Sequence, residues 1–322
     1  MRNANSVSDR RTATAAGGAP AARRIGRWID ATLAADPPRA KSLIVTVWGD
    51  SLAPHGDELW LASLIALMGA LGVAERSVRT SVFRLAADGW LAGEPTGRRS
   101  RYRLTAAGAH TFADAYRRIY FPHEEPWDGR WQLLLAPPET LAPRERAALR
   151  NALRWSGFCA LAPGLFARPR AAQGDAIALP RATLAKLTVL DAGDAGGSGV
   201  ALAGLAVQAF DLAALAASYR RFLSRFGRAI DLFRAPNPPP DPRAAFAART
   251  LLIHAFRRVL LRDPLLPPAL LPLDWPGTAA YALTRDFYRL VWRPADRFVA
   301  ATLGEDFAAA SGEFGRRFGG LG

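Results

Sequence analysis

The stretch from Glu58 to Ala107 constrains the fold of this 322-residue chain more than any other part. The apolar run Leu59 to Leu71 predicts a first helix, and Gly72-Val-Ala predicts a turn after it. Glu75 then opens a second helix with a negative charge in its first turn, where the helix dipole favours it. Gly89 stands where a left-handed C-terminal cap is expected. The stretch therefore begins with two helices joined by a tight turn.

An apolar stripe and an alternating segment complete this pattern. Val78, Val82 and Leu85 repeat at i, i+4 and i+7 and form one core-facing stripe on the second helix. Glu94 to Arg99 is a turn rich in cations, and in Ser100 to Leu104 basic side chains alternate with Tyr and Leu as on a strand. Helix, turn, helix and a two-stranded hairpin with a basic tip is the layout of a winged helix-turn-helix.

This layout favours duplex DNA as the partner. The major groove admits one α-helix, whose short polar or arginine side chains can reach base edges. A basic hairpin tip can lie along phosphates or enter the minor groove. Taken singly, each arginine is equally consistent with a solvated helix face, but the four features in this order favour DNA binding. The candidate DNA-binding residues are Glu75, Arg76, Ser77, Arg79, Thr80, Arg84, Arg98, Arg99 and Arg101.

The charge balance agrees with a polyanionic partner. The chain has 42 Lys and Arg against 28 Asp and Glu, a net charge of +14, and only Lys41 and Lys186 are lysines. An excess of this size points to nucleic acid, anionic lipid or a phosphate-bearing ligand. Composition alone leaves all three open. A membrane-surface or RNA-binding protein that uses the basic N-terminal residues therefore stays an alternative.

Cysteine content and hydropathy exclude several other classes. The single cysteine, Cys159, rules out an internal disulfide and a multi-cysteine metal site, and its apolar neighbours favour a small buried residue over a reactive thiol. The longest apolar run, Leu59 to Ala74, is shorter than the ~18–20 residues of a membrane-spanning helix. The residues after Arg11 are too polar for a signal peptide. We expect a cytoplasmic protein that does not bind a membrane.

Shifts of composition divide the chain into four expected parts. These are a flexible basic N-terminal tail (1–38), a winged-helix DNA-binding domain (39–120), a central domain (121–207) and a helical C-terminal domain (208–322). In the tail, residues up to about 22 are expected to be mobile and 23–35 to form a short helix. In the central domain, we expect a strand at 131–136, two short strands within 158–168 separated at Pro163-Gly164, and a strand at 187–190. A helix is expected at 143–155 and a Gly/Asp loop at 191–199. Helices are expected at 212–233, 244–262 and 277–303, the last interrupted near Pro294.

Sequence motifs run through nearly the whole chain beyond residue 40. They include Trp48-Gly-Asp-Ser51, Phe83-Arg84-Leu85, Gly89-Trp90-Leu91, Gly97-Arg98-Arg99-Ser100, Trp127-Asp-Gly129, Leu251-Leu-Ile-His254 and Arg317-Phe318-Gly319-Gly320-Leu321. In these motifs the chain closely resembles the PaaX family, bacterial repressors of phenylacetic acid catabolism. It departs from the family in its longer basic N-terminal tail and in its Gly-rich insert near Asp191 to Gly199. Neither departure touches the DNA-binding segment.

The resemblance implies an α+β multidomain protein. Its parts would be an N-terminal winged helix-turn-helix, a central ferredoxin-like (Cas2-like) α/β domain and a C-terminal α-helical domain. It also implies a homodimeric, cytoplasmic transcriptional repressor of phenylacetate catabolic genes, which leaves its operator DNA when phenylacetyl-coenzyme A (phenylacetyl-CoA) binds. That acyl-CoA is an effector, and no cofactor is expected. A paralogous GntR/PaaX-like regulator that responds to another aromatic acyl-CoA stays an alternative.

A coenzyme A effector places chemical demands on its site. It carries several phosphate charges and an apolar end, so the site needs cations beside an aromatic pocket. His254, Arg258 and Arg262 repeat at i, i+4 and i+8 and would form a cationic stripe on the helix at 244–262. The alternative is a solvated basic face or an interdomain salt bridge to Asp263 or Asp286. The candidate effector-binding residues are His254, Arg257, Arg258 and Arg262.

An enzyme is not expected. The four histidines are scattered without metal-ligand spacing, and neither a Gly-x-Ser-x-Gly elbow nor a phosphate-binding Gly-x-x-x-x-Gly-Lys-Ser/Thr loop is present. No catalytic residue and no metal ligand is therefore assigned. The Cas2-like resemblance leaves a metal-dependent nuclease as an alternative. That chemistry needs a carboxylate near the end of the first central strand, but Trp131 to Ala136 contains none and only Asp128 precedes it.

Overall fold

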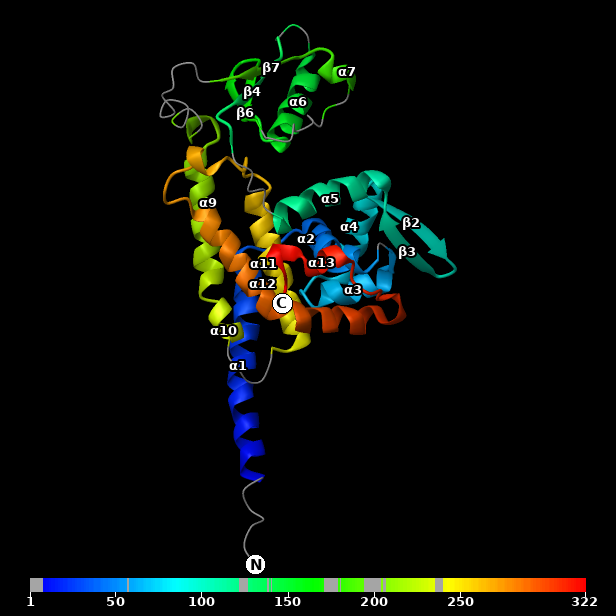
Figure 1. Cartoon of the computed structure of the whole chain (residues 1–322). Coiled ribbons are helices and arrows are strands. Elements are labelled where there is room, and N and C mark those ends of the chain that lie inside the picture. The colour runs from blue at the N-terminus through cyan, green and yellow to red at the C-terminus, as the bar shows by residue number, and fades with distance from the viewer. Residues whose placement is uncertain are drawn as a thin grey trace, which may run out of the picture. The chain divides into compact units, whose positions relative to one another are not determined.

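The computed structural model describes residues 8–56, 58–121, 127–137, 139, 141–170, 179, 181–193, 204, 207–234 and 240–322 (Figure 1). The chain divides into two compact units. Unit 1 comprises Met1–Phe121, Phe222–Arg257 and Ala280–Gly322, and unit 2 comprises Pro122–Arg221 and Arg258–Ala279. Each unit is therefore built from segments that are far apart in the sequence.

Unit 1 contains a small antiparallel sheet and most of the helices. Its N-terminal elements are α1 (Ser8–Ala35), α2 (Ala40–Val47), the π-helical η1 (Trp48–Leu52), η2 (Ala53–His55), β1 (Glu58–Trp60), α3 (Leu61–Gly69), α4 (Glu75–Ala87), β2 (Leu91–Thr96), β3 (Arg99–Leu104) and α5 (Ala106–Tyr120). The later segments add α10 (Ile230–Arg234), α13 (Gly312–Gly315), and most of α11 (Pro242–Leu260) and α12 (Pro276–Leu303). The helix α9 (Leu212–Gly227) begins in unit 2 and ends in unit 1.

The three-stranded sheet of unit 1 has the order β1-β3-β2, with all neighbours antiparallel. The hairpin of β2 and β3 is confirmed, but β1 is a strand where the sequence predicts the start of a helix. Leu59 pairs with Tyr102, and its side chain is buried. Because this pairing holds the backbone extended, the first helix begins at Leu61 and not at Leu59.

The predicted core stripe of α4 is confirmed. Val78, Val82 and Leu85 are at most 2% exposed, and the helix packs against α2 and α3. Gly89 ends the helix region with φ +74°, the left-handed conformation that favours glycine. This packing turns the opposite face of α4 toward solvent.

The N-terminal helix is longer than the sequence predicts. The chain is helical from Ser8 to Ala35, whereas the sequence predicts a helix only over 23–35. Within the helix, Trp28 packs edge-on against Phe226 and Phe233, and α1 lies beside α10 (Figure 1). Because alanine has the highest helix propensity, the Ala-rich residues before Arg23 extend a helix that this packing anchors.

Unit 2 contains a four-stranded antiparallel sheet with the order β5-β6-β4-β7. Its elements follow the chain order β4 (Trp131–Leu135), α6 (Pro143–Trp155), β5 (Cys159–Ala162), β6 (Leu165–Pro169), α7 (Arg181–Leu184) and β7 (Thr188–Ala192). This βαββαβ succession is the ferredoxin-like arrangement that the resemblance implies. Leu134, Leu153, Phe158 and Phe166 belong to one buried core. The last strand includes Asp191 and Ala192, which were expected to start a loop, and 194–199 of that loop lie outside the described residues.

The later helices follow the predicted pattern with two differences. The helix expected at 212–233 is divided into α9 and α10, and Pro294 lies inside α12 without interrupting it. In the described part of the chain, no helix has the length and apolar character needed to cross a membrane.

A buried polar cluster joins three segments of unit 1. Asp50 accepts hydrogen bonds from the hydroxyl groups of Tyr120 (2.6 Å) and Tyr288 (3.0 Å). The Arg249 Nε lies 3.0 Å from one Asp50 carboxylate oxygen, and the Arg317 Nη1 lies 3.2 Å from the other. Burial raises the pKa of both tyrosines, so both stay protonated and donate. The cluster therefore fastens the segment after α2 to α5, α11, α12 and the C-terminal residues.

Candidate nucleic-acid interface

The outward face of α4 carries the side chains that the sequence assigns to DNA. The structure brings these together on one exposed helix face, because the core stripe occupies the other side. The exposed set is Glu75, Arg76, Ser77, Arg79, Thr80 and Arg84. All six are therefore accessible to a partner.

One ion pair orders this face. The Arg79 guanidinium lies 2.7 Å from a Glu75 carboxylate oxygen, one helical turn away, and both side chains are 57% exposed. An exposed i, i+4 pair contributes only about 0.3–0.5 kcal/mol, so a phosphate or base edge can replace it. Within the described residues, Arg76 and Arg84 have no carboxylate partner. Most of the positive charge on α4 is thus unneutralised by the protein itself.

The tip of the β2–β3 hairpin adds more exposed charge. Gly97 adopts φ +62° in the turn, and Arg98 and Arg99 beside it are exposed. The Arg99 guanidinium lies 5.8 Å from the centroid of the Trp60 ring. The tip therefore presents two guanidinium groups, which can contact phosphate oxygens of nucleic acid.

Arg101 differs from the other arginines of the hairpin. Its guanidinium lies 2.5 Å from Asp306 and 3.4 Å from Glu58, and it stacks on Trp60 at 4.7 Å from the ring centroid. Two carboxylates thus counter its charge and hold it against the sheet. The structure places Arg101 apart from the exposed basic set, and its contacts are those of a residue that positions the hairpin.

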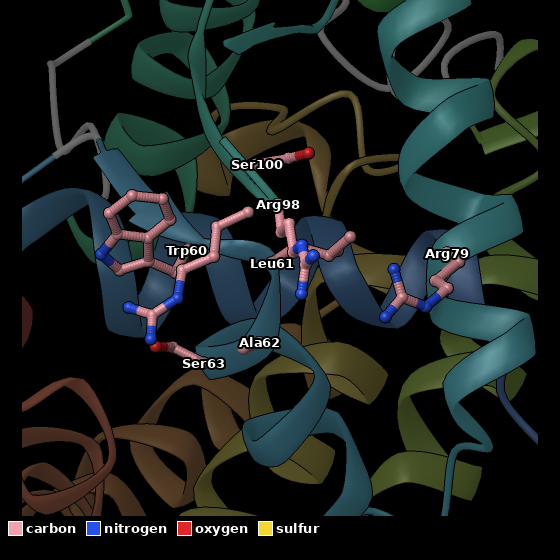
Figure 2. A pocket seen from close by; sticks show the side chains of 8 residues that line it. Trp60, Leu61, Ala62, Ser63, Arg79, Arg98 and Ser100 are labelled. Atoms are coloured by element: carbon pink, nitrogen blue, oxygen red, sulfur yellow. The ribbon is translucent and has the colours of Figure 1, made fainter. Parts of the chain in front are cut away.

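A cavity of about 350 Å³ lies where α3, α4 and the hairpin meet (Figure 2). Its lining residues are Trp60, Leu61, Ala62, Ser63, Arg79, Arg98, Arg99 and Ser100. Figure 2 shows the Arg79 side chain pointing from its helix toward Arg98, with the Trp60 indole beyond Arg98. Guanidinium groups from two elements converge on this cavity, so it suits an anionic group such as a phosphate.

The residues assigned to an effector are not brought together. The His254 Nδ1 lies 2.9 Å from the Thr46 hydroxyl, and Arg257 donates to the same hydroxyl at 2.8 Å. Both side chains thus contact α2 inside unit 1. Arg258 and Arg262 are exposed and belong to unit 2, and Arg262 lies past the end of α11 at Leu260. Among the described residues, His254, Arg258 and Arg262 therefore do not form the continuous cationic stripe that the sequence predicts on α11.

The structure also describes the single cysteine and the groups that could bind a metal ion. Cys159 is buried, its thiol donates to the Ala167 carbonyl, and burial raises its pKa to about 11, so it is a protonated core residue at neutral pH as predicted. Among the described residues, no three His, Cys, Asp or Glu side chains form a group that could hold a metal ion.

Sequence reasoning missed two residues of this region. Phe83 is 73% exposed on α4, and Trp60 lines the cavity and supports two arginines. A signal for Phe83 was present, because it stands seven residues after Arg76 and four after Arg79, and so on their face of the helix. The role of Trp60 depends on the pairing of β1 with β3 and had no local signal.

Comparison with known proteins places the chain in a family. Three family models match successive segments: PaaX-like protein (39–108), PaaX protein central Cas2-like domain (124–195) and PaaX-like protein C-terminal domain (210–301). The transcriptional repressor PaaX of Escherichia coli (strain K12) is 37% identical over 305 residues, which cover 92% of this chain and 96% of the relative. The chain belongs to the PaaX family.

A solved structure is also similar to this PaaX family member. The uncharacterized protein Rv0674 from Mycobacterium tuberculosis matches with a TM-score of 0.53 and 26% identity, over 82% of this chain and 98% of that one. The family resemblance seen in the sequence motifs is thus confirmed, as is the Cas2-like central domain. The name of the E. coli relative is that of a regulator and not of an enzyme.

Proposed function

We propose that this PaaX family member is a sequence-specific DNA-binding transcriptional repressor, and that α3, α4 and the β2–β3 hairpin form its winged helix-turn-helix. One observation carries the proposal: Arg79 of α4 and Arg98 and Arg99 of the hairpin tip, all exposed, line one cavity in a chain related to a named repressor. An α-helix of this kind fits the major groove, and a basic tip fits the adjacent phosphates.

In this proposal the exposed side chains make two kinds of contact with DNA. Arg79 and its neighbours on α4 contact base edges, while Arg98 and Arg99 contact the backbone and set the register. A homodimer would present two such helices to half-sites about 34–36 Å apart and so select an inverted repeat. Such a repressor acts on the chromosome, and the proposed location is therefore the cytoplasm.

The proposal includes an effector. Family resemblance supports phenylacetyl-CoA as the ligand that releases the operator and phenylacetate catabolic genes as the targets. His254 and Arg257 contact α2, whereas the side chains of Arg258 and Arg262 are exposed, so of the original set these two are the candidates to meet its phosphates. A different aromatic acyl-CoA would satisfy the same chemistry.

Selection of duplex DNA from a random pool by the full-length protein tests the function. We expect an inverted repeat to be enriched, and the absence of any enriched motif would contradict a sequence-specific repressor. Gel-shift titration of the selected duplex with phenylacetyl-CoA, benzoyl-CoA and free phenylacetate then tests the effector. Release by phenylacetyl-CoA alone supports the assignment, release by benzoyl-CoA alone favours the paralogue, and indifference to both thioesters removes the effector from the proposal.

A further inference from the structure

Phe83 is an apolar side chain at an unusual place. It is 73% exposed, although α4 has an apolar core stripe that a phenylalanine could have joined. At 100° per residue, Phe83 lies on the face of α4 that carries Arg76, Arg79 and Thr80, opposite the core stripe. Burial of a phenyl ring stabilises a fold, and this position forgoes that stabilisation in the isolated chain.

The charges around Phe83 decide what can cover it. Arg76 and Arg79 share its face and Arg84 is the next residue, and all three guanidinium groups are exposed. An ordinary apolar protein surface would have to bury the charges of Arg76 and Arg84 without partners, at a high desolvation cost. The DNA major groove instead offers phosphates on both rims and one apolar group on its floor, the C5 methyl of thymine.

We propose that Phe83 contacts a thymine methyl group in the major groove and thereby specifies one thymine in each operator half-site. This inference rests on the proposed DNA-binding function. The contact of Phe83 with the methyl group adds sequence information that hydrogen bonding by Arg79 or Thr80 does not carry. The methyl group distinguishes T·A from A·T by shape and apolar contact. Phe83 is thus a specificity-determining residue beyond the basic set.

Replacement of thymine by deoxyuridine tests the contact, because it removes only the methyl group. Full-length protein is titrated against the selected operator with each thymine changed to deoxyuridine in turn. Loss of one buried methyl is expected to weaken binding about fourfold at one position of each half-site, and other positions should stay near the unmodified affinity.

Protein variants then assign that effect to Phe83. In Phe83→Ala the ratio of affinities for the thymine and deoxyuridine duplexes should fall to about one, whereas Phe83→Leu should keep part of it. Thr80→Ala on the same face is the matched control and should retain the full ratio. Both positions are exposed, so circular dichroism should show unchanged folding.

Three results would overturn the inference while leaving the repressor function in place. One is the absence of any methyl-sensitive thymine in an operator that the protein binds. Another is an equal loss on both duplexes in Phe83→Ala, which means packing against sugar or phosphate. A third is a Phe83→Ala variant with unchanged operator binding and a changed sedimentation coefficient, which would show that Phe83 contacts a second copy of the chain. Failure to select any operator would overturn the function itself and this inference with it.

Discussion

Arginines occur in two opposite settings within unit 1. On α4 and the hairpin tip, Arg76 and Arg98 are exposed and contact no carboxylate among the described residues. In the cluster around Asp50, Arg249 and Arg317 are completely buried, and carboxylates or tyrosine hydroxyl groups surround them. Arginine thus provides exposed, unpaired positive charge in one region, and in the other it forms buried ion pairs that hold distant segments together.

The difference shows how the net charge of +14 should be interpreted. A buried arginine whose carboxylate partner is also buried contributes nothing to a partner's binding, whereas an exposed and unpaired one attracts a polyanion. Arg101 is an intermediate case, since Asp306 and Glu58 counter its charge at the edge of the exposed region. Local pairing, more than the total charge, is therefore the basis on which we propose the interface.

The largest effect is expected at the buried cluster. Arg317→Ala leaves the Asp50 carboxylate with one guanidinium partner and two buried tyrosine hydroxyl groups, so it should lower the free energy of unfolding by about 3–5 kcal/mol. Urea denaturation followed by tryptophan fluorescence measures this. Arg316→Ala, at the exposed neighbouring position, is the control and should stay within about 0.5 kcal/mol of the parent chain. Equal stability of both variants would contradict the distinction between buried arginines that stabilise the fold and exposed arginines that do not.

A smaller effect, on binding and not on stability, is expected at Arg79. Arg79→Ala should weaken operator binding by about 1–3 kcal/mol and relax the base preference at one position, because a guanidinium can donate to two acceptors of a guanine. Fluorescence anisotropy with the selected operator, its single-base variants and a random duplex measures both properties. An equal loss on every duplex would instead assign Arg79 to a phosphate.

The smallest effect is expected at the hairpin, where it compares the exposed Arg99 with the paired Arg101. Arg99→Ala should reduce affinity on all sequences and flatten the slope of log K against log salt by about one unit, as loss of a phosphate contact does. Arg101→Ala should change the slope less, because two carboxylates already counter that charge. The reverse order of the two slopes would move Arg101 into the interface and Arg99 out of it.

The sequence predicts most of what depends on local periodicity. The core stripe of α4 follows from a repeat of about 3.6 residues, and with it the exposed basic face. The hairpin follows from alternation at every second residue, and the strands of the central sheet follow from short apolar runs. It does not predict β1, since Leu59 and Trp60 continue an apolar helix pattern and only pairing with β3 makes them a strand.

Distant partners explain the remaining differences. Arg101 resembles Arg99 in sequence, yet its carboxylate partner Asp306 is 205 residues away. Arg249 and Arg317 have nothing local that marks them as buried, because their partner Asp50 comes from another segment. His254 and Arg257 were expected to bind an effector, and their contacts with Thr46 appear only when α11 packs on α2.

The salt dependence of operator binding in two charge-matched triple variants tests the central claim most directly. One variant changes Arg76, Arg98 and Arg99 to glutamine, and the other changes the exposed arginines Arg144, Arg150 and Arg154 on α6, so both lose three positive charges. The account predicts that the first flattens the slope of log K against log salt by about two units, one each for the phosphate contacts of Arg98 and Arg99, and that the second leaves it nearly unchanged. Equal flattening in both would show that total charge, and not the face formed by α4 and the hairpin, binds the DNA.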